Sequence, residues 1–252
     1  MSTDTPAQPP PPPVKYAVAL FPGFQLLDVA GPLDVLAVLA AAQQSPVEVA
    51  VLAATLAPVS SRTARPGSVG QAIVPTHTFD APPADVEVLL VPGGGGTRDV
   101  HATQDLVDYV EKVFPKLRYF LSVCTGAALA ARAGVLDGRR ATTNKLAFDW
   151  VRITLLFSCC NEDSWQCFGK LTSLAQVASQ NPKVHWVRHA RWVTDGNVWT
   201  SSGISAGIDM TFGFVAAQYG EDVAATVAHR QEYIRNTDPN NDPFAPDSPQ
   251  KQ

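Results

Sequence analysis

The sequence predicts a single α/β domain in which a parallel β-sheet is covered by helices on both faces. Short apolar runs alternate with helical patterns along the chain, and the apolar residues of each run follow one another without a gap. Uninterrupted apolar runs are typical of parallel strands that are buried on both faces. In addition, Asp195-Gly196 separates two strand-like runs and predicts an antiparallel hairpin added to the sheet.

The first half of the chain supplies the predicted strands and helices in alternation. The apolar run at 16–21 ends at Pro22-Gly23 and predicts a buried strand, and Pro32 is well placed to begin the helix that follows. Apolar runs at 47–53 and 71–79 predict two further strands, of which the second is irregular.

The second half continues the alternation and then closes with helices. The run at 86–96 predicts a strand that ends in glycines, a helix is expected over about 103–113, and "YFLSVC" (119–124) predicts the next strand. Two closing helices are expected over 205–219 and 223–235.

The composition restricts the classes of protein to which this chain can belong. Of the 252 residues, 46% are hydrophobic and 17% are charged, which allows a substantial core. A net charge of -4 without a basic stripe argues against nucleic acid as a partner. We find no apolar run of the ~18 residues needed to cross a bilayer. Four cysteines without framework spacing predict a reduced, cytoplasmic protein.

Both ends of the chain differ in composition from the domain that we expect over residues 15–236. Residues 1–14 are rich in proline, lack the charged and apolar regions of a signal peptide, and predict a disordered leader. Residues 237–252 form a turn-rich tail that we expect to lie over the surface or to fray.

Cys124 lies at the end of a predicted central strand, directly before a helix. Active sites of open α/β sheets gather at the carboxyl ends of the strands. The N–H groups and dipole of a helix N-terminus stabilise an anion, so we expect this position to lower the thiol pKa. A small-residue turn, Thr125-Gly126-Ala127, would leave the sulfur accessible. A buried structural cysteine is the alternative, and position alone does not decide between the two.

Two further segments end at the same edge of the predicted sheet. The amides of "VPGGGG" (91–96) could pair with the Thr125 amide as an oxyanion hole. A phosphate loop is the competing interpretation, but no Gly-Lys-Ser/Thr follows. Asp28 follows the first strand and is expected near the edge, with helix capping as its alternative role.

These segments resemble the ThiJ/PfpI superfamily, whose flavodoxin-like fold is that of class I glutamine amidotransferases, and within it the isonitrile hydratase-like branch. The resemblance rests on "ALFPGFQLLDVAGPLDVL", "DVEVLLVPGGGG" and "FLSVCTGAALAARAGVLDGRRATTN", together with "NPKVHWVRHARWVTDGNVWTSSGISAGIDM" and the closing helices. It covers nearly all of residues 15–245.

The resemblance implies an enzyme that adds water to an isonitrile to give an N-substituted formamide. It implies that Cys124 is the nucleophile on a strained elbow, that Asp28 is the partner acid and that Thr125 contributes to the site. Gly94 or Gly95 would supply the second oxyanion donor. A small-molecule substrate and a homodimer are implied. One Cys and one Asp suffice for this reaction, so we expect no cofactor or metal, and no membrane partner.

Two other functions stay open. A glyoxalase or glycation-repair enzyme of this fold would use the same Cys124, although a Glu is the usual partner acid there. Related domains also serve as sensors in transcription regulators, which would need a helix-turn-helix domain behind this one, and an accessible thiol can report oxidation. Thr125 stands where peptidase-like members carry His. His185 and His189 are expected to be surface or packing residues of a strand.

Residues 151–176 are unlike their surroundings and interrupt the resemblance. Removing them joins "KLAFDW" to "VASQNPKVHWV", and the codons of Val-Arg and Ala-Gln are compatible with splice-site ends. We therefore interpret this segment as a retained intron that is translated in frame. A genuine surface insertion, or a zinc loop on Cys159, Cys160 and Cys167, is the alternative.

Overall fold

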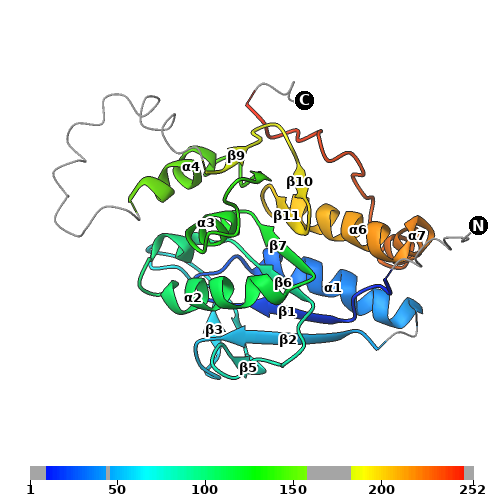
Figure 1. The fold of residues 1–252 in the computed structure, drawn as a ribbon, viewed down its shortest axis with the longest axis horizontal. Coiled ribbons are helices and arrows are strands. Elements are labelled where there is room, and N and C mark those ends of the chain that lie inside the picture. The colour runs from blue at the N-terminus through cyan, green and yellow to red at the C-terminus, as the bar shows by residue number, and fades with distance from the viewer. Residues whose placement is uncertain (1–9, 44–45, 158–182, 247–252) are drawn as a thin grey trace, which may run out of the picture.

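A computed structural model describes residues 10–43, 46–157 and 183–246 (Figure 1). In chain order the elements are β1 (Lys15–Ala19), α1 (Leu26–Gln43), β2 (Glu48–Ala53), β3 (Val59–Ser60), β4 (Ala72–Ile73), β5 (His77–Thr78), β6 (Val88–Val91), η1 (Gly95–Arg98), α2 (Gln104–Val113), η2 (Phe114–Lys116), β7 (Tyr119–Val123), α3 (Gly126–Arg132), β8 (Arg140–Ala141), α4 (Phe148–Phe157), β9 (His185–Trp186), β10 (Trp192–Asp195), β11 (Val198–Ser201), α6 (Ser205–Tyr219) and α7 (Glu221–Arg230).

Seven strands form the central sheet in the order β10-β11-β7-β6-β1-β2-β5. Every neighbouring pair is parallel except β10 and β11, which form the predicted antiparallel hairpin. Helices α1, α6 and α7 pack together on one face, and α2 and α3 cover the other (Figure 1). The predicted fold class is confirmed. It places the carboxyl ends of β1, β6, β7 and β11 along one edge of the sheet.

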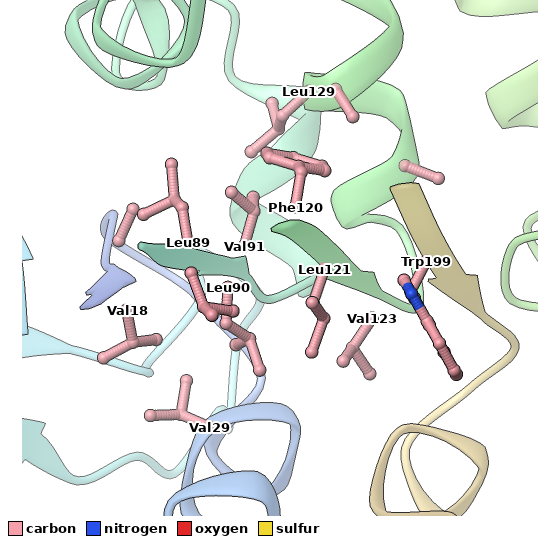
Figure 2. Close-up of a cluster of buried hydrophobic side chains, with 14 of the residues drawn as sticks. Val18, Val29, Leu89, Leu90, Val91, Phe120, Leu121, Val123, Leu129 and Trp199 are labelled. Carbon is pink, nitrogen blue, oxygen red and sulfur yellow. The ribbon is translucent and has the colours of Figure 1, made fainter. Parts of the chain in front are cut away.

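The core explains why β6 is apolar at every position. Successive side chains of a strand point to opposite faces. Leu89 and Val91 of β6 point toward Leu129 of α3, whereas Leu90 points to the face covered by α1, which contributes Val29 (Figure 2). All five side chains are buried. A sheet covered on both faces therefore leaves no position on β6 for a polar residue.

Helix α1 differs from its prediction in two ways. It begins at Leu26, and Pro32, which we expected to start it, lies inside it. A proline removes a single backbone hydrogen bond, and packing against the sheet, α6 and α7 offsets that loss. With 18 residues and a mean hydropathy of 1.6, α1 also meets the length and composition of a membrane span, contrary to our expectation. Buried side chains along it, including Val29 and Leu39, identify it as a core helix.

Several short elements were not foreseen. The strand predicted at 71–79 is divided into β4 and β5, and Pro75 lies between them, where it cannot donate to a ladder. The two-residue strands β3 and β8 and the helix α4 had no clear signal in the sequence.

Residues 10–14 of the predicted leader and residues 237–246 of the predicted tail pack against the domain more closely than predicted. Arg118 Nη2 donates to the carbonyl of Pro11 at 2.7 Å, and the Tyr219 hydroxyl donates to that of Pro13. In the tail, the Pro239 carbonyl accepts the Arg191 N–H at 2.7 Å. Asp242 is 1% exposed. The domain therefore includes residues that we assigned to its mobile ends.

The atypical segment is described only in part. Residues 151–157 continue helix α4, with Val151 buried, so Trp150 does not mark a structural boundary. Residues 158–182, on which the intron, insertion and zinc-loop interpretations depend, lie outside the described residues.

Candidate active site

Cys124 lies on a strained elbow between β7 and α3, as predicted. Its φ angle is 58°, in the left-handed region that residues other than glycine rarely adopt. The backbone is held on both sides: the Cys124 N–H is shared between the carbonyls of Ser201 (3.2 Å) and Ser202 (3.1 Å), and the Thr143 hydroxyl donates to the Cys124 carbonyl at 2.7 Å. These contacts from β11 and the segment after β8 fix the direction of the thiol.

Two glycines allow the backbone to pack closely around the elbow. A Cβ atom on Gly126 would lie 2.5 Å from the Val91 carbonyl oxygen. A Cβ atom on Gly93 would lie 2.5 Å from the Thr125 nitrogen and 2.8 Å from Cys124 Cβ. Gly93 is therefore the glycine of the loop that contacts the nucleophile, because only a residue without a side chain fits there.

Asp28 reaches Cys124 from the first turn of α1. Its side chain is fully buried, and Oδ2 accepts the Gly93 N–H at 3.0 Å. Oδ1 has no hydrogen-bond partner of good geometry among the described residues. The Cys124 thiol lies against the carboxyl group and stabilises its ionised form. Since Asp28 bonds to the end of β6 instead of its own helix, the capping role that we considered is wrong.

The pKa values of Asp28 and Cys124 correct one of our predictions. Burial raises the pKa of Asp28 to about 7, although the Gly93 N–H and the thiol oppose this shift. Burial and then the Asp28 charge raise the pKa of Cys124 to about 12, against the opposing effects of Thr125 and Asn144. The predicted lowering of the thiol pKa by the helix N-terminus is therefore wrong, because burial and a neighbouring anion outweigh it. At neutral pH, the thiol keeps its proton beside a carboxylate that can accept it.

Cys124 is accordingly expected to react slowly with iodoacetamide at neutral pH. Its alkylation should accelerate only well above the ordinary thiol pKa of about 8.5, because the thiolate is the reactive form. The variant Asp28→Asn removes the neighbouring charge and should move the alkylation profile to lower pH. Mass spectrometry of the Cys124 peptide across neutral and alkaline pH measures both profiles. If the wild type is alkylated at lower pH than free cysteine, the helix dipole outweighs burial and the Asp28 charge in setting the pKa of Cys124.

Thr125 organises the glycine loop. Its Oγ1 accepts the Gly94 N–H at 2.9 Å, so this amide already has a partner and does not serve as the second oxyanion donor in this structure. Gly95 packs beside Thr63, and its role as a donor stays a prediction. The Thr125 N–H itself faces the sulfur and lowers the thiol pKa. Thr125 thus contacts the thiol through its amide and the glycine loop through its hydroxyl, and its role in catalysis stays a prediction.

Asn144 is the residue of this site that the sequence analysis missed. Its side chain contacts the Cys124 thiol, and it lies two residues after Thr142, whose N–H is held by the Thr200 hydroxyl at 2.8 Å. The quoted stretch that ends "RATTN" was the available signal, but nothing in it distinguishes Asn144 from a loop residue.

A cavity of about 780 Å³ lies next to two residues that contact Cys124. It is lined by Asn144, which contacts the thiol, by Ser202, which accepts the Cys124 N–H, and by the residues Lys145, Leu146, Gly203, Ile204, Ser205, Pro243, Phe244, Ala245 and Pro246. A volume of this size holds a small organic molecule.

The histidines do not take part in the described site. His101, His185 and His189 are all exposed on the surface. His185 lies on β9 as expected, whereas His189 lies outside any strand. The side chains gathered around the sulfur are those of Asp28, Thr125 and Asn144. The titratable group that lies beside the Cys124 thiol is therefore the Asp28 carboxyl group.

Comparison with known proteins agrees with this geometry. The DJ-1/PfpI family pattern matches residues 14–217. Isonitrile hydratase from Pseudomonas putida is 32% identical over 214 residues, 85% of this chain and 76% of that enzyme. Deglycase PH1704 from Pyrococcus horikoshii is 31% identical over 78 residues, 31% of this chain and 47% of its own. A solved ThiJ/PfpI family protein from Pseudomonas syringae superposes with a TM-score of 0.65 at 24% identity, over 94% of this chain and 81% of its own. The chain therefore belongs to the DJ-1/PfpI family.

Proposed function

We propose that this protein hydrates isonitriles to N-substituted formamides, with Cys124 as the nucleophile and Asp28 as the acid–base group. One observation carries the proposal: a buried thiol keeps its proton against a carboxyl group whose pKa is raised to about 7. A weak nucleophile beside a general base of near-neutral pKa is the arrangement that a thiol addition needs. The similarity to isonitrile hydratase supports the same choice.

The first half of the reaction adds the thiol across the isonitrile carbon. Asp28 takes the proton of Cys124 while Sγ bonds to the carbon of R–N≡C. Asp28 then returns this proton to the same carbon, which gives a thioimidate, Cys–S–CH=N–R, and leaves the carboxylate as it began. Asp28 Oδ1 can carry the proton because no hydrogen bond from the described residues occupies it.

The second half hydrolyses the thioimidate with the same carboxyl group. Asp28 takes a proton from water as the water oxygen bonds to the carbon, and it delivers this proton to the nitrogen. The C–S bond then breaks, the new hydroxyl proton passes through Asp28 to the sulfur, and R–NH–CHO leaves. Atoms and charge balance over the cycle, and one carboxyl group serves as base and acid in each step.

The two alternatives are less well supported by the site. A glycation-repair enzyme would use the same Cys124, but Asp28 stands where that branch carries a Glu. A redox sensor needs an accessible thiol of low pKa, whereas Cys124 is 7% exposed and its pKa is raised. Both properties suit a thiol that is activated only when a substrate is in place.

Turnover of a simple isonitrile beside methylglyoxal tests the proposal. We expect formation of the N-substituted formamide, identified by mass spectrometry, and little consumption of methylglyoxal. Consumption of methylglyoxal without isonitrile turnover would favour the glycation-repair activity. Inertness toward both substrates, with reversible oxidation of Cys124, would favour the sensor.

A further inference from the structure

The C-terminal tail forms part of the cavity beside Cys124. Pro243, Phe244, Ala245 and Pro246 line it together with Asn144, which contacts the thiol. A molecule that fills the cavity and contacts Asn144 would therefore also contact the tail. The part of a substrate that does not react must also be placed in this space.

A buried ion pair holds the tail in position. Asp242 Oδ2 lies 3.5 Å from Lys145 Nζ, and the two side chains are 0% and 4% exposed. Asp242 Oδ1 also accepts the Phe244 N–H at 3.0 Å, so a single carboxylate both shapes the turn of the tail and ties it to the domain. Breaking a buried pair by removing one partner is costly, so this contact fixes the tail firmly.

Lys145 connects this anchor to the active site. It directly follows Asn144, and its ammonium group donates to the Ala190 carbonyl at 2.6 Å and to the Thr142 hydroxyl at 2.9 Å. The ammonium group is therefore paired within the protein, and we do not expect it to bind a charged substrate. The position of the tail and the position of Asn144 depend on the same short segment.

The remaining lining of the cavity is apolar or neutral. Leu146 and Phe244 are 101% and 71% exposed, and Ile204 and two prolines add to the apolar surface. Ser202 and Ser205 are the neutral polar residues near the elbow. Apart from Lys145, which is paired, none of the lining residues carries a charge. Such a lining favours an uncharged organic group that covers Leu146 and Phe244 when it binds.

We infer that the C-terminal tail, held by Asp242 and Lys145, is the specificity-determining wall of the substrate site and accommodates a bulky, uncharged, apolar substituent. The inference rests on the proposed function for the identity of the reacting group, but not for the site of binding. Phe244 is the side chain of the tail that provides the most apolar contact area.

Kinetics with two isonitriles of different size test this inference. We expect Phe244→Ala and Asp242→Asn to raise KM for benzyl isocyanide about tenfold, since loss of an apolar contact has effects of this order. For methyl isocyanide, KM and kcat of Phe244→Ala should stay within about twofold of the wild type. Asn240→Ala, on the exposed part of the same tail, is the matched control and should change the kinetic constants for neither substrate.

Alkylation of Cys124 tests the tail independently of isonitrile turnover. N-benzyl iodoacetamide should label Cys124 faster than iodoacetamide does, and Phe244→Ala should abolish this preference. If isonitriles are not substrates but Phe244→Ala still loses the labelling preference for N-benzyl iodoacetamide, the proposed function is wrong and the inference about the tail is supported. Should both variants keep wild-type KM and labelling preference, or lose kcat for methyl isocyanide equally, the tail does not determine specificity.

Discussion

Cys124→Ala is expected to abolish isonitrile turnover and leave the fold intact. The covalent thioimidate cannot form without the sulfur, and Cys124 is the only free cysteine among the described residues. Cys124 is held by its backbone, through Ser201, Ser202 and Thr143, so these contacts survive the substitution. Formamide production at saturating isonitrile measures the loss, and thermal unfolding monitors the fold.

Ser122→Ala provides the control for this result. Ser122 is buried on β7, the strand that precedes Cys124, and its hydroxyl has no hydrogen-bond partner among the described residues. Its removal should leave turnover close to that of the wild type. Residual turnover in Cys124→Ala above the rate in buffer would mean that Asp28 activates water directly and that no covalent intermediate forms.

The order of the strands and helices could be predicted because the chain gives a strong signal for each central element. Apolar runs such as 86–91 have no polar alternation, and this property follows directly from burial on both faces. The two-residue strands β3 and β8 could not be predicted, since they depend on partners distant in the sequence. The start of α1 was misplaced because Pro32 is an ordinary signal for a helix N-terminus that packing here overrides.

The proximity of Cys124 and Asp28 could be predicted from the sequence, but the electrostatics of the two groups could not. Cys124 and Asp28 follow strand ends, and the topology brings the ends of β1 and β7 to one edge of the sheet. The degree of burial is not visible in the sequence, and it is burial that reverses the expected shift of the Cys124 pKa. Asn144 and the tail residue Asp242 reach the site through long connections, which no local pattern reveals.

Asp28→Asn is expected to reduce kcat by about 10²- to 10⁴-fold, the range typical for loss of a general acid–base group. The amide keeps the geometry, because its oxygen can still accept the Gly93 N–H. It cannot accept the thiol proton or return a proton to the substrate, so both halves of the reaction lose their proton carrier. Pre-steady-state kinetics with an isonitrile should show slow formation of the thioimidate as well as slow release of the formamide.

The same substitution is expected to stabilise the protein at neutral pH. The pKa of Asp28 is raised from 3.8 to about 7 in the folded protein. Between these values the unfolded chain has released the proton that the folded protein retains, so the free energy of unfolding decreases as pH rises from about 4 to 7. The amide of the Asp28→Asn variant carries no such charge. The free energy of unfolding of the variant should therefore exceed that of the wild type by about 4 kcal/mol above pH 7, and this difference should vanish near pH 4.

Loss of activity together with gain of stability distinguishes a catalytic carboxyl group from a structural one. A cap or a surface carboxylate would lose stability when neutralised, whereas a buried acid that is kept for its chemistry imposes a cost on the fold. Asp34→Asn, on the exposed side of the same helix, is the matched control and should change neither kcat nor the pH dependence of unfolding. Normal turnover in Asp28→Asn would show that Asp28 does not carry the proton transfers and that the acid–base assignment is wrong.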